Sequence, residues 1–465
     1  MKKVILSADI GTSSFKAAYI DFNGYLLAFI RSTYNMGASS FDWEKAFFSA
    51  LEALHAQAPG CGIECLCISG NGPTLVPVDA SGQAMPPLYW FDGNFLSSAK
   101  MPSLEKKDKM GDSFFLPRAA WFKEKSPLAY KKTSRFFSSH EWLCFKLGAE
   151  PFAALPHRDY EPYYWDDEQC RLFGLDRKKF PPFMKMGSVV GKVSAEAAAK
   201  TTAKTAVKAT TETAAKAARS LGQILLGGTP IIAGGPDFIT ALIGSGTVKE
   251  GLVCDRAGSS EGINVCASVR PVEQLSSSVP GIDLRVLPHA IEGLWNIGAV
   301  IPASGRLFEQ YRSATAQGSR GYEELLAELI PIDSRLTSSH AAHSTIDKGQ
   351  AVLCSIAFKV RSALEKLARA GFNVKEMRVS GGQGKSPLWN QLKADITGVT
   401  LVVPEICDAE LAGNAVLSVA ALSSNQDTRD MSFNETLFTE INRMIRMKEV
   451  YKPNPDRVFF CEGKI

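Results

Sequence analysis

The amino-acid sequence predicts an α/β protein built from two similar halves. Segments rich in β-branched residues alternate with segments of helical periodicity, which is the pattern of α/β folds. Two motifs of the first half, Asp9-Ile-Gly-Thr-Ser-Ser and Ile68-Ser-Gly-Asn-Gly-Pro, have loose counterparts in Arg256-Ala-Gly-Ser-Ser-Glu and Val379-Ser-Gly-Gly-Gln-Gly. Because the order is the same in both halves, we infer a duplicated α/β domain with a cleft between the copies.

The first half opens with a predicted β-hairpin. Residues 4–10 and 15–21 are mostly apolar and rich in strand-forming side chains, and the polar residues 11–14 form a short loop between them. The next predicted elements, in chain order, are a strand at 25–31, a helix at 43–56, a strand at 64–69 and a mostly helical region at 112–147.

The composition changes in the middle of the chain. Residues 194–220 are rich in Ala, Thr and Lys and carry a charge every four residues, so we expect a surface helix or a loosely ordered insert there. Residues 230–237 then predict a buried strand that ends in a tight turn, and a helix is predicted from Phe238 onward. At this junction we divide the chain into an N-terminal domain of residues 1–243 and a C-terminal domain of residues 244–465.

Composition and charge exclude several classes of protein. The 52 Lys and Arg residues exceed the 48 Asp and Glu residues by only 52 − 48 = 4, which is too small an excess to predict nucleic-acid binding. No apolar run reaches the roughly 18 residues of a membrane-spanning helix, and the apolar run at the N-terminus ends at Asp9, too early for a secretory leader. We therefore expect a soluble, cytoplasmic protein that binds neither nucleic acid nor membrane.

The cysteines predict buried thiols rather than a metal centre. Only Cys61, Cys65 and Cys67 cluster among the ten cysteines, and they contain no C-x-x-C pair. Structural metal sites use characteristic ligand spacings that this cluster lacks.

The loop Gly11-Thr12-Ser13-Ser14 predicts a phosphate-binding site. Phosphates are bound by backbone N–H groups and hydroxyls where few side chains obstruct them. Lys16 follows the loop, and Asp9, just ahead of it, could hold Mg²⁺ directly or through water. An ordinary polar hairpin turn is an equally good interpretation of this motif alone. The P-loop pattern G-x-x-x-x-G-K-[ST] is absent from the sequence.

Asp237 has two interpretations that are compatible with each other. It follows Ala233-Gly-Gly-Pro at the predicted junction between domains. As a helix N-cap it would have a common structural role. As a general base it would accept the proton of a reacting hydroxyl. From the local residues alone the cap is the simpler interpretation.

Six motifs resemble those of the FGGY carbohydrate kinases. They occur in family order and extend from about residue 4 to about residue 420. The block at 381–395, followed by Val402-Val-Pro-Glu, is the most specific. The six motifs are Asp9-Ile-Gly-Thr-Ser-Ser-Phe-Lys, Ile68-Ser-Gly-Asn-Gly-Pro-Thr-Leu-Val-Pro-Val-Asp, Leu88-Tyr-Trp-Phe-Asp, Gly234-Gly-Pro-Asp, Gly381-Gly-Gln-Gly-Lys-Ser-Pro-Leu-Trp-Asn-Gln-Leu-Lys-Ala-Asp and Glu410-Leu-Ala-Gly-Asn-Ala.

The resemblance implies an α/β fold of two actin-like (ribonuclease H-like) domains flanking an ATP/sugar cleft. ATP and Mg²⁺ are the implied cofactors, Asp237 is the implied catalytic base and Asp9 the implied metal ligand. The implied ATP-binding residues are Gly11, Thr12, Ser13, Ser14, Lys16, Gly258, Ser259, Gly381 and Gly382, with Gln391 and Gly413 the less certain members. The implied substrate-binding residues are Asn71, Gly72, Pro73, Trp90, Asp92 and Asp237, and core packing is the alternative for Trp90.

The substrate end departs from the family pattern. Relatives that act on xylulose or glycerol carry Met-His or Arg-Glu where this chain has Gly72-Pro73, and Gly and Pro cannot grip substrate hydroxyls through their side chains.

The resulting expectation is ATP-dependent phosphorylation of a small sugar, foremost a ketopentose such as xylulose or ribulose. A kinase of a polyol such as glycerol or erythritol is one alternative. A catalytically silent sugar or nucleotide sensor on the same scaffold is the other. Relatives commonly form homodimers, so a homodimer is a further expectation.

Overall fold

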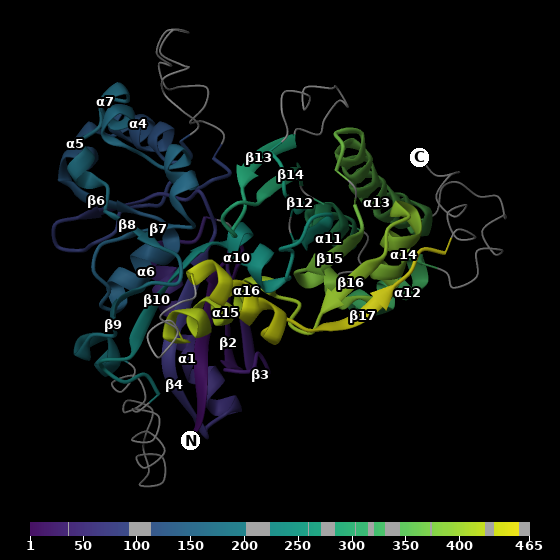
Figure 1. Cartoon of the computed structure of the whole chain (residues 1–465), viewed down its shortest axis with the longest axis horizontal. Helices are drawn as coiled ribbons and strands as arrows, with labels where there is room; N and C mark the ends of the chain where they lie inside the picture. The colour runs from purple at the N-terminus through teal and green to yellow at the C-terminus, as the bar shows by residue number, and fades with distance from the viewer. Residues whose placement is uncertain are drawn as a thin grey trace. The chain divides into compact units, whose positions relative to one another are not determined.

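The structure is a computed structural model that describes residues 1–35, 37–92, 113–200, 224–258, 260–270, 284–302, 304–314, 320–330, 345–372, 374–423 and 432–454. The chain forms two compact units (Figure 1). Unit 1 comprises Met1–Thr240 and Glu410–Met444, and unit 2 comprises Ala241–Ala409 and Ile445–Ile465. Helix α10 (Asp237–Gly244) carries the chain from unit 1 into unit 2, and helix α15 (Ala409–Ser423) carries it back.

The core of unit 1 is a six-stranded sheet in the order β3-β2-β1-β4-β10-β9. Strands β1, β2 and β3 are antiparallel neighbours, β4 and β10 run parallel to β1, and β9 is antiparallel to β10. The strands are β1 (Lys2–Ile10), β2 (Ser14–Asp21), β3 (Leu26–Thr33), β4 (Cys61–Gly70), β9 (Val189–Lys192) and β10 (Pro230–Pro236).

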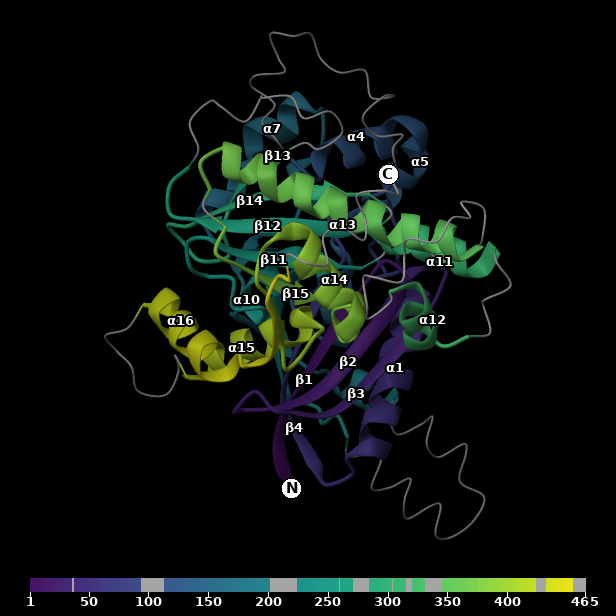
Figure 2. The ribbon, with the colours of Figure 1, turned by 90° about the vertical axis from the view of Figure 1, so that its right-hand side faces the viewer.

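Helix α1 (Ser40–Gln57) shows how the sequence builds this unit. It starts at a capping box in which the backbone N–H groups of Ser39 and Asp42 each donate to the other residue's side chain. Its buried residues Trp43, Phe47 and Leu51 recur every four positions, and the helix packs against β2 and β3. Figure 2 shows α1 beside these strands.

The rest of unit 1 is made of short elements. The helices are α4 (Leu116–Lys125), α5 (Pro127–Lys132), α6 (Ser139–Leu147), α7 (Asp167–Leu172) and α16 (Phe433–Met444), with 3₁₀ turns at Arg158–Tyr163 and Arg177–Lys179. Two small sheets pair β5 (Val76–Asp79) with β6 (Thr133–Phe137) and β7 (Ala153–Leu155) with β8 (Phe183–Lys185).

The described residues 113–147 are mostly helical, as expected, but strand β6 interrupts the helices. It lies between α5 and α6 and pairs antiparallel with β5, more than 50 positions earlier in the chain. A pairing over this separation leaves no periodic signal within the segment itself, so aromatic spacing alone favoured helix. The Ala-, Thr- and Lys-rich stretch at 195–219 lies outside the described residues after Lys200.

Unit 2 contains a seven-stranded sheet in the order β13-β14-β12-β11-β15-β16-β17. Its strands are β11 (Leu252–Ala257), β12 (Glu261–Ala267), β13 (Leu284–Pro288), β14 (Trp295–Ile301), β15 (Glu376–Ser380), β16 (Leu401–Pro404) and β17 (Met447–Tyr451). Its helices are α11 (Ser304–Ala314), α12 (Tyr322–Leu329), α13 (Thr345–Arg369) and α14 (Pro387–Thr397). Figure 2 shows α13 lying along the sheet, where it contacts β12 and β14.

The two units repeat one topology. Six strands of unit 2, in the order β14-β12-β11-β15-β16-β17, match β3-β2-β1-β4-β10-β9 in order and in every parallel or antiparallel pairing. The paired sequence motifs lie at the ends of equivalent strands. The motifs that begin at Asp9 and Arg256 lie at the ends of β1 and β11, and those that begin at Ile68 and Val379 lie at the ends of β4 and β15. The prediction of a duplicated α/β domain is therefore confirmed. No helix in the described ranges is long and apolar enough to cross a membrane.

Candidate functional site

The carboxyl ends of three parallel strands define the candidate site in unit 1. Asp9 lies at the end of β1, Asn71 follows β4 and Asp237 follows β10. In open α/β sheets ligands bind at this edge, because the loops that leave neighbouring parallel strands emerge there together. Residues far apart in sequence are thus brought to one place.

The loop at the tip of the β1–β2 hairpin is tightly held. The N–H of Gly11 donates to the Ser14 carbonyl at 2.9 Å, and a Cβ on Gly11 would lie 2.8 Å from that same oxygen. The Gly11 carbonyl accepts from Asn71 Nδ2 at 3.1 Å and from the Tyr34 hydroxyl at 2.6 Å. The position therefore requires glycine, and two neighbouring strand ends fix the loop's shape.

Trp90 is attached to the same loop. Its indole N–H donates to Thr12 Oγ1 at 3.1 Å, and its carbonyl accepts from Arg118 at 3.2 Å. Asp92 is part of the adjoining turn, where it accepts the N–H of Tyr89 at 3.1 Å. The structure thus joins two residues predicted to contact substrate, Asn71 and Trp90, to the loop predicted to contact phosphate.

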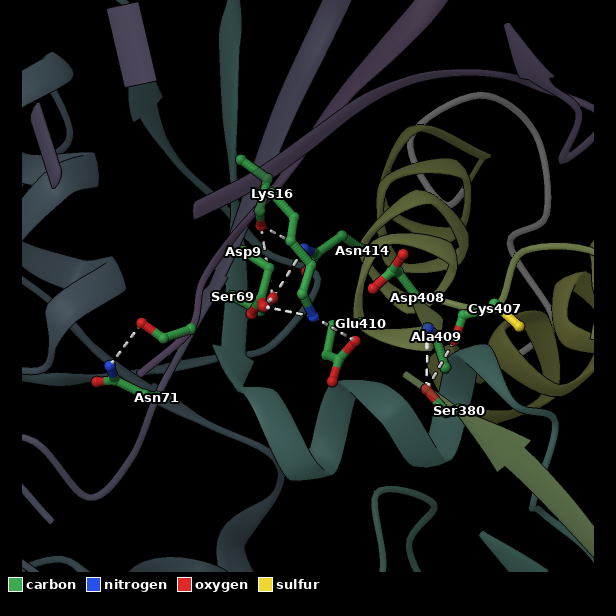
Figure 3. A network of polar contacts seen from close by, with 12 residues as sticks. Asp9, Lys16, Ser69, Asn71, Ser380, Cys407, Asp408, Ala409, Glu410 and Asn414 are labelled. Atoms are coloured by element: carbon green, nitrogen blue, oxygen red, sulfur yellow. Dashed lines mark hydrogen bonds and ion pairs between the residues drawn. The ribbon is translucent and has the colours of Figure 1, made fainter. Parts of the chain in front are cut away.

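Asp9 lies buried beside this loop in a charged network (Figure 3). Its Oδ1 accepts from Ser69 Oγ at 2.8 Å, and its Oδ2 is 3.3 Å from Lys16 Nζ. Lys16 Nζ is also 3.3 Å from Glu410 Oε2. Lys16, predicted to contact ATP, therefore pairs with two carboxylates inside unit 1.

Burial raises the pKa of Asp9 to about 6. Lys16 lowers this pKa, whereas the carboxylates of Glu410 and Asp237 raise it further.

Helix α15 supplies two residues of this network that sequence reasoning missed as site residues. Asn414 donates through Nδ2 to the Ala8 carbonyl at 2.8 Å and to Ser69 Oγ at 3.1 Å, and Glu410 is the second partner of Lys16. Both lie inside the motif Glu410-Leu-Ala-Gly-Asn-Ala, which was the available signal.

Close packing positions Asp237. It opens α10 directly after β10 and is half-buried. A Cβ on Gly234 would lie 2.0 Å from the Ile68 carbonyl, so β10 passes β4 at a distance that only glycine permits. The Thr240 hydroxyl donates to the Pro236 carbonyl at 3.1 Å across the first turn of the helix.

A small pocket lies next to Asp237 within unit 1. Pro236 and Phe238, which precede and follow Asp237 in the chain, both line this pocket, as do Gly72 and Pro73. The cavity volume of the pocket is about 20 Å³, which is room for about one water molecule. The remaining lining residues, none of which sequence reasoning identified, are Phe114, Phe115, Ser138, His140, Tyr160 and Tyr164.

In unit 2 the equivalent strand ends bring two predicted nucleotide loops together. Gly381 adopts φ +95° and donates its N–H to the Cys407 carbonyl at 2.8 Å. It also passes close to Ala257, because a Cβ added to Gly381 would lie 2.6 Å from the Ala257 carbonyl oxygen. Gln383 Nε2, in the 3₁₀ turn Gly382–Lys385, donates to the Gly258 carbonyl at 3.1 Å. Ser259 lies outside the described residues.

Two of the predicted ATP-binding residues have structural partners. Gln391 donates to Asp395 Oδ1 at 2.7 Å and to the Lys452 carbonyl at 2.8 Å. Gly413 lies in α15 where a Cβ would approach the Thr240 carbonyl oxygen to 2.1 Å. Gly413 therefore lets α15 pack closely against the first turn of α10.

Replacing Gly413 with alanine should destabilise unit 1. The added methyl group cannot fit 2.1 Å from a carbonyl oxygen without displacing one helix, and overpacking of this kind costs roughly 1–3 kcal/mol. Denaturant unfolding of Gly413→Ala measures the loss. Gly60→Ala is the matched control in unit 1, because a Cβ there meets nothing within 4 Å. Equal midpoints for the two variants would contradict the packing role.

Comparisons with known proteins agree with this architecture. The N-terminal domain model of the FGGY family of carbohydrate kinases matches residues 4–213, and the C-terminal domain model of that family matches residues 314–422. An autoinducer-2 kinase from Salmonella paratyphi B is 22% identical over 531 residues, which cover 97% of this chain and 91% of that protein.

Solved structures show the same fold. Xylulose kinase from Lactobacillus acidophilus superposes with a TM-score of 0.73 at 17% identity and covers 99% of this chain and 96% of that one. Plasmodium falciparum glycerol kinase with ADP superposes with a TM-score of 0.69 at 15% identity and covers 97% and 94% of the two chains. The predicted fold class of two actin-like (ribonuclease H-like) domains is confirmed. With both family models matched in chain order, the protein belongs to the FGGY family of carbohydrate kinases and is an ATP-dependent sugar kinase.

Proposed function

We propose that this kinase transfers the γ-phosphoryl group of ATP to a hydroxyl of a small sugar, foremost a ketopentose such as xylulose or ribulose, with Asp237 as general base. The arrangement of Asp237 carries the proposal. It lies at the same edge of the sheet as Asp9 and Asn71, its charge raises the pKa of Asp9, and the residues on either side of it line the pocket. A proton acceptor between an acceptor pocket and a phosphate loop is what the reaction needs.

In the proposed reaction Asp237 accepts the proton of the sugar hydroxyl while the hydroxyl oxygen attacks the γ-phosphorus. The new P–O bond forms as the bond from the γ-phosphorus to the bridging oxygen breaks, and ADP leaves with that bond's electron pair. Most of the remaining rate enhancement would come from positioning and from neutralising charge on the phosphoryl oxygens. The loop from Gly11 to Ser14 would contact phosphate, and Gly258, Ser259, Gly381 and Gly382 would contact the nucleotide.

The residues of unit 1 suit Mg²⁺, with Asp9 as the proposed ligand. Mg²⁺ prefers oxygen donors and is usually held by one or two carboxylates together with substrate phosphates and water. No group of three or more acidic, His or Cys ligands occurs in the part of the chain that the structure describes. Asp9, whose pKa is raised by the charges of Glu410 and Asp237, offers the few-carboxylate setting that Mg²⁺ uses. Bound Mg²⁺ supplies charge neutralisation at the phosphates.

The substrate panel follows from the relatives. Autoinducer-2, xylulose and glycerol kinases are all similar to this chain, so the panel contains ketopentoses, polyols and autoinducer-2. The test is ADP formation with ATP and Mg²⁺ across this panel. Strong turnover on a ketopentose supports the proposal. Turnover on a polyol alone favours the polyol alternative, and binding without turnover favours a silent sensor.

We place the enzyme in the cytoplasm and expect a homodimer. Analytical sedimentation would measure the oligomeric state.

Lys16 should set the acidic limb of the pH–activity profile. Asp9 must be ionised to hold a cation, so activity should rise with pH through its pKa of about 6. Lys16 lowers this pKa, so Lys16→Met should raise it and move the limb to higher pH. The measurement is kcat/KM from roughly pH 5 to pH 9, which spans the ordinary carboxylate and histidine range.

The control for this variant is Lys3→Met. Lys3 is exposed near the start of β1, the strand that ends at Asp9 and Ile10, and it pairs with Glu64 at 3.2 Å. It should leave the limb unchanged. If the acidic limb of the kcat/KM profile lies at the same pH in Lys16→Met as in the wild type, Asp9 is not the group whose titration sets that limb.

A further inference from the structure

A lysine and two acids are buried together in unit 2, at the base of the loop that joins β11 to β12. Asp255 lies on β11 and Glu261 begins β12, so the two acids are on the strands that flank Gly258 and Ser260. Lys393 on α14 lies 2.6 Å from Asp255 Oδ2 through its Nζ and also contacts Glu261 Oε1, and all three side chains are 0% exposed. One cation therefore links the two strands of this hairpin.

Helix α14 is attached to the β11–β12 loop by a second route. Trp389, one turn before Lys393, donates its indole N–H to Gln383 Oε1 at 2.8 Å, and Gln383 Nε2 donates to the Gly258 carbonyl at 3.1 Å. The Lys393 ammonium lies 5.6 Å from the centre of the Trp389 ring. Gln383 belongs to the 3₁₀ turn that also contains Gly382, so α14 is bonded to both predicted nucleotide loops of unit 2.

The charges of this buried triad do not balance without a proton. Two ionised carboxylates and one ammonium group leave one net negative charge, and an uncompensated buried charge is strongly disfavoured. Asp255 Oδ1 and Glu261 Oε2 also lack a hydrogen-bond partner in the described part of the chain. A proton on one carboxyl group removes the excess charge and makes that group a hydrogen-bond donor for the other.

The surroundings of Glu261 favour its protonated form. Burial and then the charge of Asp255 raise the pKa of Glu261 to about 8, while Lys393 lowers it. Beyond the triad, the charge of Lys393 also acts on Tyr322 of α12, together with the charges of Glu309, Glu323 and Arg312. The other elements packed against β11 and β12 contribute apolar neighbours, which include Ile301 of β14, Val379 of β15, and Val360 and Ala363 of α13.

We propose that Asp255 and Glu261 share one proton and that this protonated triad positions the β11–β12 loop for nucleotide binding. Lys393 and the shared proton hold the two strands together where two ionised acids would repel each other. This inference rests on the proposed function, in which Gly258 contacts the nucleotide. At alkaline pH the proton is released to water, and the net negative charge left at the base of the loop should weaken binding of the anionic phosphates.

The first test follows nucleotide affinity across pH. We expect the Kd for MgADP, measured by titration calorimetry, to rise roughly tenfold between about pH 7 and about pH 9.5, because proton and nucleotide binding are linked. Glutamine resembles the protonated acid but has no proton to release, so Glu261→Gln should remove this rise. A rise of wild-type size in Glu261→Gln overturns the inference.

The matched control is Glu365→Gln in α13. The Glu365 side chain is 46% exposed and pairs with Arg361 at 2.9 Å. The substitution should leave the wild-type pH profile unchanged. In turnover assays the KM for ATP should follow the same profile as the Kd, whereas the KM for the acceptor should not. Equal changes in both KM values would indicate a general structural role and contradict the positioning role.

A second variant tests whether the proton is shared. In Asp255→Asn, Glu261 keeps Lys393 as its partner but loses the carboxylate that raises its pKa, so Glu261 should be ionised at neutral pH and the alkaline rise should again disappear. Persistence of the rise in this variant contradicts a shared proton. Thermal midpoints at neutral pH establish that both variants are folded.

Infrared spectroscopy separates failure of this inference from failure of the proposed function. The nucleotide-free wild type should show the C=O stretching band of a protonated carboxyl group that disappears at alkaline pH and is missing in Glu261→Gln. If no acceptor is phosphorylated but this band and the MgADP profile both depend on Glu261, the proposed function fails and the positioning role stands. If an acceptor is phosphorylated and Glu261→Gln keeps the wild-type band and profile, the proposed function stands and this inference fails.

Discussion

Replacing Asp237 with asparagine should reduce kcat by roughly 10²–10⁴-fold, the range over which general bases contribute. Asparagine has nearly the same shape but cannot accept a proton at neutral pH. Because Asp237 is half-buried at the start of α10, the substitution should leave the fold intact. The measurement is sugar-phosphate formation at saturating ATP and acceptor, with ATP affinity determined separately and expected to be nearly unchanged.

Two comparisons make this result interpretable. Asp167→Asn removes a carboxylate that is 92% exposed in unit 1, and it should keep wild-type turnover. The thermal midpoint of Asp237→Asn reports whether a loss of rate reflects loss of fold. Wild-type turnover in Asp237→Asn would show that another group accepts the proton.

Replacing Lys393 with methionine should strongly destabilise unit 2. Lys393, Asp255 and Glu261 are all fully buried, and Lys393 Nζ lies 2.6 Å from Asp255 Oδ2 and also contacts Glu261 Oε1. The second oxygens of both carboxylates are buried without a hydrogen-bond partner. Lys393 is therefore the cation that makes their burial tolerable, and its pKa is raised by the two carboxylates against the opposing effect of burial.

Removing one partner of a buried ion pair typically costs about 3–5 kcal/mol, because the remaining charge is left uncompensated in an apolar core. We expect Lys393→Met to lower the denaturant midpoint accordingly. Adding Asp255→Asn and Glu261→Gln to this variant should recover part of the loss, since the buried charges are then removed together. A wild-type midpoint in Lys393→Met would contradict the role assigned to the triad.

The matched control is Lys448→Met. Lys448 pairs with Glu449 at 3.0 Å, but its side chain is 63% exposed. Surface pairs of this kind contribute little because water screens them. No measurable change in midpoint is expected.

The sequence by itself determined the class of fold and the position of the hairpin loop at residues 11–14. The strands on either side of residues 11–14 are continuous apolar runs, and hairpin formation depends on near neighbours in the chain. The division into similar halves was also readable, because the repeated motifs follow equivalent strands β1 and β11. Asp9 and Asp237 each end a strand that the local sequence predicts, and the family resemblance proposed their roles as metal ligand and base.

Only the tertiary structure decided which distant residues complete the site. Glu410 and Asn414 reach Lys16 and Ser69 from helix α15, more than 300 positions away, and no local periodicity encodes such a contact. The small pocket beside Asp237 combines segments near residues 72, 114, 138, 160 and 236, each of which alone has the composition of ordinary core. The tertiary structure also showed that Gly413 and Gln391 have packing and hydrogen-bonding roles. Local pattern specifies strands and their end residues, whereas the chemistry of a pocket depends on how separate elements pack against one another.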